Sequence, residues 1–277
     1  MRAWVNGQLL KTPGAPVISV LDHGMIVGDG VFETVAVNHG EPFALTRHLD
    51  RLVRSAKGLG IGDPDLDAVR EGIAATMEGQ EIPFGRIRIT VTSGPGPLGS
   101  PRGHNGLTTT VITEPCPKPP PTSAFVTVPW PRNERGALAG LKTTSYAENA
   151  KMVEYALARD ASEAVMPNTQ GLLCEGTGSN VFYVQDDTLI TPTLDSGCLA
   201  GVTRALVLQW CADELDVVER DAPIEVLAEA DEVMLVGTTR EVQAIAQVDD
   251  RELPAPGPVT RKVQEIWERE SVKAVDP

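Results

Sequence analysis

Apolar positions in the first part of the chain follow two periods, one typical of strands and one typical of helices. Stretches that alternate or run apolar predict strands, and apolar residues three and four positions apart predict helices. The expected strands are APVISV (15–20), VFETVAV (31–37) and GRIRITVT (85–92), and the expected helices cover 46–60 and 65–78. The N-terminal part therefore mixes α and β structure.

The second part of the chain shows the same mixture over a longer stretch. Its expected strands are FVTVPW (125–130), EAVMP (163–167), NVFYV (180–184), DEVMLVG (231–237) and EVQAIAQV (241–248). Helical spacing predicts helices near 145–159, 202–214, 222–229 and 258–271. These elements do not alternate strictly as β-α-β, and no glycine-rich phosphate loop opens a helix after a strand. The expected fold class is α/β of the mixed α+β type, and neither a Rossmann nor a P-loop fold.

Proline is concentrated in TEPCPKPPPTS (113–123). Because proline lacks an N–H and has a fixed φ, this stretch is expected to exclude a continuous helix or a central strand and to link two domains. We expect a small N-terminal domain at 1–116, a linker at 117–123 and a larger C-terminal domain at 124–277 that contains Lys142.

Composition and charge exclude several classes of partner. Lys and Arg number 24 against 38 Asp and Glu, a formal net charge of −14, which argues against nucleic acid or an anionic membrane. No stretch approaches the roughly 20 apolar residues of a spanning helix, and MRAWVNGQLLKTPG (1–14) does not resemble a secretory signal, so we expect a cytoplasmic protein. The four cysteines lack metal-binding spacing and are expected to be reduced thiols, with no metal site.

Lys142 is a first candidate for chemistry. Ser145 and Glu148 fit a capping box, which places Lys142 just before a helix N-terminus. The apolar stripe of that helix would consist of Tyr146, Ala150, Val153 and Leu157. The positive end of a helix dipole disfavours an ammonium, and a lysine that loses its proton readily suits imine chemistry. A solvated loop lysine is the alternative.

Glu175 is a second candidate, because it stands between an apolar pair and a turn of small residues that leads into a strand. A carboxylate in that position either caps backbone N–H groups of the turn or pairs with a cation or a protonated ring nitrogen of a cofactor. Further on, Gly201–Arg204 opens an apolar helix and fits an anion site or an ordinary N-cap by Thr203. Spacing alone does not choose between these alternatives.

Two further segments carry polar groups of uncertain use. The run Asp231–Thr239 is expected to be a buried strand that ends in two hydroxyls, suited to phosphate or to a turn. In helix 46–60, Leu49, Leu52, Val53 and Ala56 form the core stripe, which leaves an arginine row on the other face, interpreted as solvated. That row consists of Arg47, Arg51 and Arg54.

In their order along the chain, these features resemble the fold-type IV pyridoxal-phosphate enzymes, a two-domain group. It comprises branched-chain aminotransferases, D-amino-acid aminotransferases and aminodeoxychorismate lyases. The resemblance rests on Asp22-His23-Gly24, Gly28-Asp29-Gly30-Val31-Phe32-Glu33, His48-Leu49-Asp50-Arg51-Leu52, Lys142, Glu175-Gly176 with Asn180, Thr191-Pro192, Leu199-Ala200-Gly201-Val202-Thr203-Arg204 and Gly237-Thr238. It covers most of the chain.

The resemblance implies pyridoxal 5′-phosphate as cofactor and gives each matching residue a role. Lys142 would be the Schiff-base lysine and proton carrier, and Glu175 the partner of the pyridine nitrogen, which a carboxylate keeps protonated. The implied phosphate contacts are Arg51, the backbone of Val202 and Thr203, and the hydroxyl of Thr238. The resemblance further places Leu199 on the ring face and Tyr146 at the ring oxygen.

Two reactions divide the group: amino transfer from an amino donor to a 2-oxo acid, and release of pyruvate and 4-aminobenzoate from 4-amino-4-deoxychorismate. Leu138–Lys142 and the modest length of the chain are similar to the lyases. Gly28–Glu33 and Ser100–His104 are similar to the D-amino-acid aminotransferases. We favour the transaminase, with the lyase as alternative and a catalytically silent metabolite-binding protein as a third hypothesis.

In the D-amino-acid enzymes an Arg-x-His pair holds the substrate carboxylate, which implies that Arg102 and His104 bind substrate together with Phe32 and Thr239. An arginine fork offers charge-assisted donors to a carboxylate. A solvated glycine- and proline-rich loop is the alternative for this segment. Phe32 stands where those enzymes frequently have a tyrosine, which predicts a broader range that extends to primary (R)-amines. The resemblance also implies a homodimer.

Overall fold

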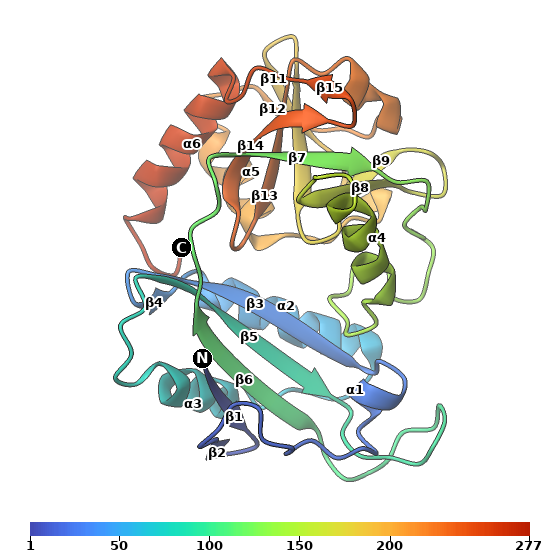
Figure 1. The fold of residues 1–277 in the computed structure, drawn as a ribbon, viewed down its shortest axis with the longest axis vertical. Helices are drawn as coiled ribbons and strands as arrows, with labels where there is room; N and C mark the ends of the chain where they lie inside the picture. Colours follow the sequence, from blue (N-terminus) through green and yellow to red (C-terminus); the bar gives the residue numbers. More distant parts are fainter. The chain divides into compact units, whose positions relative to one another are not determined.

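The computed structural model describes residues 1–277 and divides into two compact units, each with a sheet and a core of its own (Figure 1). Unit 1 consists of Met1–Lys118, Leu141–Tyr146 and Val275–Pro277. Unit 2 consists of Pro119–Gly140 and Ala147–Ala274. The mixed α and β architecture expected from the sequence is confirmed.

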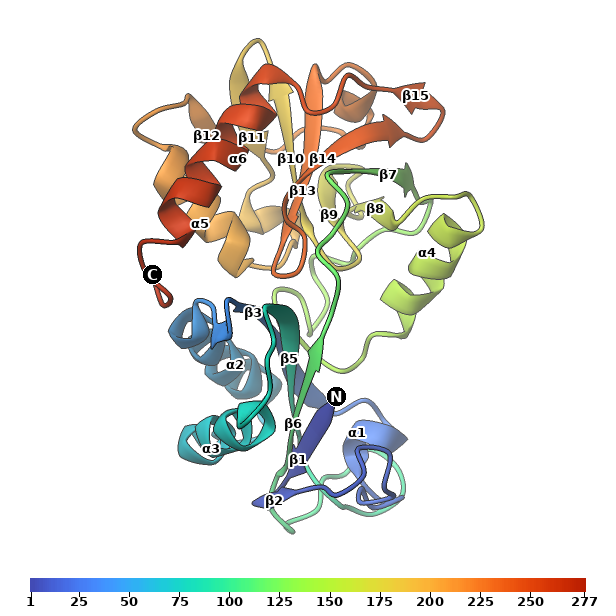
Figure 2. The ribbon, with the colours of Figure 1, turned by 60° about the vertical axis from the view of Figure 1, so that its left-hand side comes forward.

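Unit 1 is a six-stranded antiparallel sheet in the order β2-β1-β6-β5-β3-β4, with two helices on one face (Figure 2). Its strands are β1 (Arg2–Val5), β2 (Gln8–Leu9), β3 (Gly30–Asn38), β4 (Glu41–Pro42), β5 (Phe84–Thr92) and β6 (Thr108–Pro115). Its helices are α1 (His23–Ile26), α2 (Leu45–Leu59) and α3 (Leu66–Met77), of which α2 and α3 cover the sheet.

The alternation in β3 and β5 gives the two faces of this sheet different chemistry. Val31 and Val35 of β3 and Ile89 of β5 belong to the core that α2 and α3 cover. Because successive strand residues point to opposite faces, Phe32 and Arg88 project from the other face of the same sheet. The polar residues of β5 therefore mark the face away from the two helices, whereas Glu33 of β3 lies on the face that the helices cover.

Unit 2 is a nine-stranded mixed sheet, with β15 attached beside the main path β12-β11-β10-β13-β14-β7-β8-β9. Its strands are β7 (Thr122–Thr127), β8 (Glu163–Pro167), β9 (Leu173–Gly176), β10 (Asn180–Gln185), β11 (Thr188–Thr191), β12 (Val217–Glu219), β13 (Glu232–Gly237), β14 (Glu241–Val248) and β15 (Arg251–Glu252). Its helices are α4 (Ala147–Leu157), α5 (Val202–Cys211) and α6 (Pro258–Ser271), with the 3₁₀ turns η1 (Leu194–Ser196) and η2 (Ile224–Ala228). Strands β10 and β13 are apolar almost throughout, as is typical of strands buried on both faces.

Three expectations about strands and helices were wrong. APVISV (15–20) forms bends and turns, because its proline and largely exposed side chains have no partner strand. The segment 113–115 ends β6, a central strand, since Glu114 and Pro115 pair with Arg86 and Gly85. The predicted helix 222–229 is the short 3₁₀ turn η2.

The capping box and the apolar stripe expected for α4 are also wrong. The Ser145 hydroxyl donates to the carbonyl of Gly28, and the helix begins at Ala147. Its buried residues are Asn149, Met152 and Ala156. Ala150 and Leu157 of the expected stripe are exposed.

None of the helices combines the length and the apolar character that crossing a bilayer requires.

Candidate active site

Lys142, expected in the C-terminal domain, lies in an extended segment of unit 1 that pairs with the edge of β3. Its carbonyl accepts from the Phe32 N–H at 3.0 Å, Thr144 N–H donates to the Gly30 carbonyl at 2.8 Å, and Val31 and Thr143 form an antiparallel bridge. The Lys142 N–H donates to Ser55 Oγ of α2 at 3.2 Å. Lys142 is therefore fixed by a strand pairing, and the expectation that it immediately precedes a helix is wrong, since α4 begins at Ala147.

The side chain of Lys142 projects onto the aromatic ring of Phe32. Directly opposed residues of an antiparallel pair share a face, and Lys142 Nζ lies 4.4 Å from the centre of that ring. Tyr146 meets the same ring edge-on, with ring centres 5.2 Å apart. Lys142 and Tyr146, both assigned to the cofactor by resemblance, thus lie around Phe32, which was assigned to the substrate.

Arg88 is a residue of this face that sequence analysis missed. Its guanidinium carbon lies 3.3 Å from the centre of the Phe32 ring, and burial lowers the pKa of Arg88 to about 10. The alternation Arg86-Ile87-Arg88-Ile89 in β5 was a usable signal, because it places both arginines on the face opposite the core. Arg88 and Lys142 thus both contact the Phe32 ring.

Arg51 occupies a buried ion cluster with Glu33 and His48, on the core side of β3. Its Nε and Nη2 donate to the two carboxylate oxygens of Glu33 at 2.8 and 2.7 Å, and His48 Nδ1 lies 2.8 Å from Glu33 Oε2. Burial alone would raise the pKa of Glu33, but Arg51 and His48 lower it to about 2. The interpretation of Arg51 as part of a solvated arginine row is wrong, since it is 5% exposed.

Arg102 is held by its own unit. Its Nε and Nη2 donate to Asp29 at 2.7 Å each, Nη1 donates to the Gly60 carbonyl at 2.6 Å, and Nη2 also donates to the Leu59 carbonyl at 2.9 Å. The Arg102 hydrogen bonds lower the pKa of Asp29. These contacts use four of the five guanidinium N–H groups, which leaves one for another partner. His104 is exposed in the same loop.

In unit 2 the carboxylate of Glu175 contacts a backbone N–H and a cation, the two kinds of partner between which the sequence did not choose. Its Oε2 accepts from the backbone N–H of Leu199 at 2.9 Å, and Oε1 lies 3.3 Å from Arg132 Nε. Glu175 is only 8% exposed. Arg132 was not predicted, because only the tertiary fold brings its segment to the end of β8, next to β9, and no local pattern marks it.

The segment from Leu199 to Thr203 begins at the Leu199 N–H that binds Glu175. Asn180 Nδ2 donates to the Leu199 carbonyl at 2.9 Å, and a Cβ on Gly201 would lie 2.0 Å from Asn180 Oδ1, so only glycine fits there. Gly201 is the N-cap of α5 and offers no capping side chain, which excludes Thr203 as the N-cap. The first N–H groups of α5, including those of Val202 and Thr203, are suited to an anion.

Thr238 and Thr239 form the turn between β13 and β14. Val236 pairs with Asn180, and a Cβ on Gly237 would lie 3.3 Å from the Gly178 carbonyl. Both threonines are half-buried. Unit 2 therefore brings Glu175, Leu199, the start of α5 and this turn together around Asn180.

Comparison with known proteins shows the family of the chain. The sequence model described as amino-transferase class IV matches residues 30–248. The chain belongs to the class IV aminotransferases. This family uses pyridoxal 5′-phosphate, as the sequence resemblance implied.

Relatives of this class IV aminotransferase carry two kinds of name. It is 32% identical over 273 residues to a putative branched-chain-amino-acid aminotransferase of Methanocaldococcus jannaschii, covering 96% of this chain and 94% of that protein. It is 30% identical over 271 residues to a D-alanine aminotransferase of Bacillus licheniformis, covering 95% of each. The crystal structure of a branched-chain aminotransferase from Thermoproteus uzoniensis with norvaline matches with a TM-score of 0.89 at 30% identity, over 99% of this chain and 95% of that one.

The residues present fit pyridoxal phosphate. Glu175 is an anion of the kind a protonated ring nitrogen needs, and its cationic and N–H neighbours favour the ionised carboxylate. The start of α5, which has no side-chain cap, suits a phosphate, and Thr238 adds a hydroxyl. Lys142 supplies an amine, and three hydrogen bonds, two to β3 and one to Ser55 Oγ, fix its backbone segment.

Proposed function

We propose that this class IV aminotransferase transfers the amino group of a D-amino acid to a 2-oxo acid, with the cofactor bound covalently at Lys142. The position of Lys142 carries the proposal. Its backbone is fixed on β3 and its Nζ lies over the Phe32 ring, so the amine is held close to that ring. A lysine that only covered the surface would need no such restraint.

When bound, pyridoxal phosphate accepts the electron pair that is released as a substrate C–H bond breaks. The chain's residues make this possible by holding charges and moving a proton. Once the incoming substrate amine has displaced it from the cofactor, Lys142 Nζ would be a free amine that can take the proton from the substrate carbon and return it later in the reaction. Glu175 remains ionised beside Arg132 and the Leu199 N–H, so that it can hold a proton on the ring nitrogen.

We assign the phosphate to Arg51, the N–H groups of Val202 and Thr203, and the Thr238 hydroxyl. A dianion at the start of α5 gains from the helix dipole and from N–H groups that have no side-chain cap. Leu199 is assigned to the ring face and Tyr146 to the ring oxygen.

We assign the substrate to Phe32, Arg102, His104 and Thr239. The Arg102-Gly103-His104 sequence and the D-alanine aminotransferase relative support a D-amino acid. Because Asp29 occupies the fork of Arg102, we propose that the single remaining Nη1 N–H binds the carboxylate. A carboxylate held by fewer donors would also admit primary (R)-amines.

Transamination of branched-chain amino acids is the second candidate. The Methanocaldococcus jannaschii relative and the Thermoproteus uzoniensis structure, both at 30% identity or more, favour it. The apolar Phe32 ring would suit a branched aliphatic side chain. The lyase alternative rests on the Leu138–Lys142 sequence.

We further propose a homodimer. The segment from Val17 to Val27 exposes six large apolar side chains, an unusual concentration for a free surface. They are Val17, Ile18, Val20, Leu21, Met25 and Val27. Burial of this segment against a second copy would remove them from water.

The test uses the purified chain reconstituted with pyridoxal phosphate. We expect borohydride to fix the cofactor at Lys142, detected by peptide mapping, and D-alanine with 2-oxoglutarate to yield pyruvate and glutamate. L-leucine with 2-oxoglutarate and aminodeoxychorismate alone are offered in parallel. A preference for L-leucine would replace the D-amino-acid proposal by the second candidate, and pyruvate from aminodeoxychorismate would establish the lyase. An adduct on another lysine would overturn the role of Lys142.

A further inference from the structure

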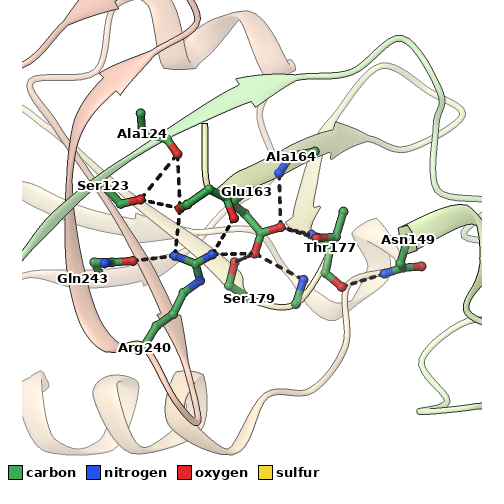
Figure 3. A network of polar contacts seen from close by, with 11 residues as sticks. Ser123, Ala124, Asn149, Glu163, Ala164, Thr177, Ser179, Arg240 and Gln243 are labelled. Atoms are coloured by element: carbon green, nitrogen blue, oxygen red, sulfur yellow. Dashed lines mark hydrogen bonds and ion pairs between the residues drawn. The ribbon is translucent and has the colours of Figure 1, made fainter. Parts of the chain in front are cut away.

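The carboxylate of Glu163, at the start of β8, is buried and accepts hydrogen bonds from the turn Thr177–Ser179 (Figure 3). It is 2% exposed. Its Oε1 accepts from the N–H groups of Ala164 and Thr177 at 3.1 and 3.0 Å and from the Thr177 hydroxyl. Its Oε2 accepts from Ser179 Oγ at 3.0 Å and from the Gly178 N–H at 3.4 Å. One side chain thus fixes all three residues of that turn.

The same carboxylate reaches the turn between β13 and β14 through Arg240. Arg240 Nη2 lies 3.5 Å from Glu163 Oε2 and donates to the Ser162 carbonyl at 2.9 Å (Figure 3). Arg240 Nη1 donates to Gln243 Oε1 at 2.5 Å and to Ser162 Oγ at 3.2 Å. Arg240 directly follows Thr238 and Thr239, so its anchoring restrains the backbone of both threonines.

The network continues from the Thr177–Ser179 turn to Glu175. Asn149 Nδ2 donates to the Thr177 carbonyl at 2.7 Å (Figure 3), and both terminal nitrogens of Arg132 lie 3.4 Å from Asn149 Oδ1. Arg132 is in turn the cation beside Glu175. The two turns and the Glu175 carboxylate are therefore linked within unit 2 by hydrogen bonds and by the ion pairs of Arg132 with Glu175 and of Arg240 with Glu163.

A buried charge is costly, and an apolar residue would fill the space of Glu163 without that cost. What only a carboxylate supplies is acceptor capacity: donors converge on both oxygens, and an ionised carboxylate presents acceptors alone. An amide of the same shape would turn an NH₂ group toward some of these donors. The chemistry of the position therefore selects a carboxylate and links it to the geometry of the turns.

We propose that Glu163 is a positioning residue, which sets the Thr238–Thr239 turn against the Thr177–Ser179 turn and thereby holds the Thr238 hydroxyl in place for the cofactor phosphate. This inference rests on the proposed function, because it needs the phosphate at Thr238. It assigns Glu163 no contact with cofactor or substrate. Arg240 transmits its effect to the turn.

The test compares ligands with and without a phosphate. Apoprotein variants are titrated with pyridoxal 5′-phosphate and with pyridoxal, and binding is followed by absorbance. We expect Glu163→Gln to raise the Kd for pyridoxal phosphate about tenfold or more and that for pyridoxal less than threefold. Arg240→Gln, which leaves the carboxylate and the Thr177–Ser179 turn in place, should shift the two constants in the same unequal way, and it serves as the test if Glu163→Gln does not fold.

Glu232→Gln is the matched control. Glu232 is a buried carboxylate of the same unit, 6% exposed, that accepts from the Val259 and Thr260 N–H groups at 2.9 and 2.7 Å and from the Thr260 hydroxyl at 2.6 Å. Its loss should lower Tm and leave both Kd values within twofold of wild type. Equal weakening of both ligands in Glu163→Gln, or no weakening in either variant, would overturn the positioning role. Failure of the wild type to form the Lys142 adduct would instead overturn the proposed function.

Discussion

At the scale of single residues, the setting of Lys142 is an antiparallel pairing with Phe32. The sequence indicated a lysine before a helix, where the helix dipole would weaken its ammonium form. The structure places it opposite Phe32 at the edge of β3, with Arg88 over the same ring. The Lys142 amine therefore lies against an aromatic ring that also contacts a second cation. No local sequence pattern encodes a pairing between positions so far apart along the chain.

Glu175→Gln tests the charge of the second candidate residue. We expect this variant to bind cofactor and to lose kcat on the order of a hundredfold or more, the scale of a lost charge stabilisation in an enclosed site. The amide oxygen can still accept from the Leu199 N–H, but a neutral amide cannot keep a ring nitrogen protonated. Steady-state rates and the cofactor content after borohydride reduction measure the two effects separately. Unchanged turnover would leave Glu175 with a purely structural role, as the partner of Arg132 and the Leu199 N–H.

At the scale of elements, long periodic stretches were predictable and pairings were not. The helices at 46–60, 65–78 and 258–271 and the strands at 163–167 and 241–248 are close to the observed elements, because each keeps one period over its length. Strand β6 was missed, since its threonine-rich start and proline end hide a central strand. Its neighbours β1 and β5 supply the ladder that local sequence could not indicate.

The residues of the candidate site also divide into those that the sequence indicated and those that only the tertiary structure reveals. Family motifs indicated Lys142, Glu175 and the start of α5 as candidates, because the chemistry of such a site would constrain those residue types locally. Arg132 and Arg88 were missed, since each reaches its partner only through the sheet. Arg51 was placed on a solvated face, because helical spacing alone does not reveal a buried acidic partner such as Glu33.

Arg102→Ala tests the loop that carries the proposed substrate arginine. One charge-assisted hydrogen bond contributes about 1.5 to 3 kcal/mol, so we expect kcat/KM for D-alanine to fall roughly tenfold to a hundredfold. The value for (R)-1-phenylethylamine, which has no carboxylate, should change less than threefold. Steady-state rates with one 2-oxo acid acceptor give the ratio.

Loss of the Asp29 contact lowers the stability of the protein, which affects the rates with both substrates alike. The ratio of the two kcat/KM values therefore isolates carboxylate binding. Equal losses for the acid and the amine would mean that Arg102 only fastens its loop to Asp29, Leu59 and Gly60. Thermal unfolding of the variant measures that structural contribution separately.

At the scale of the whole molecule, two electrostatic effects oppose each other as the pH falls. The chain carries a net charge of −14 at pH 7 and has a pI near 4.7, so mild acid relieves general repulsion and favours the folded state. The buried cluster of Glu33, His48 and Arg51 acts in the other direction. Its carboxylate is stabilised in the ionised form, and burial lowers the pKa of His48. High salt screens the first effect far more than the second.

We therefore predict that, in about 0.5 M salt, the stability of the chain declines on acidification in two ranges. A histidine whose folded pKa is depressed below its usual 6.5 binds its proton more readily when unfolded, so the His48 contribution is complete above pH 6.5 and is lost as the pH falls below it. Glu33, with a folded pKa of about 2 against 4.5, contributes fully above pH 4.5 and loses that contribution between pH 4.5 and 2.

Denaturant unfolding from pH 8 to 3 measures the decline in both pH ranges. His48→Gln should flatten the upper range, and Glu33→Gln, which leaves Arg51 buried without its anion, should lower stability at pH 7 and flatten the lower range. A slope below pH 4.5 that Glu33→Gln leaves as steep as in the wild type would show that other carboxylates govern acid unfolding.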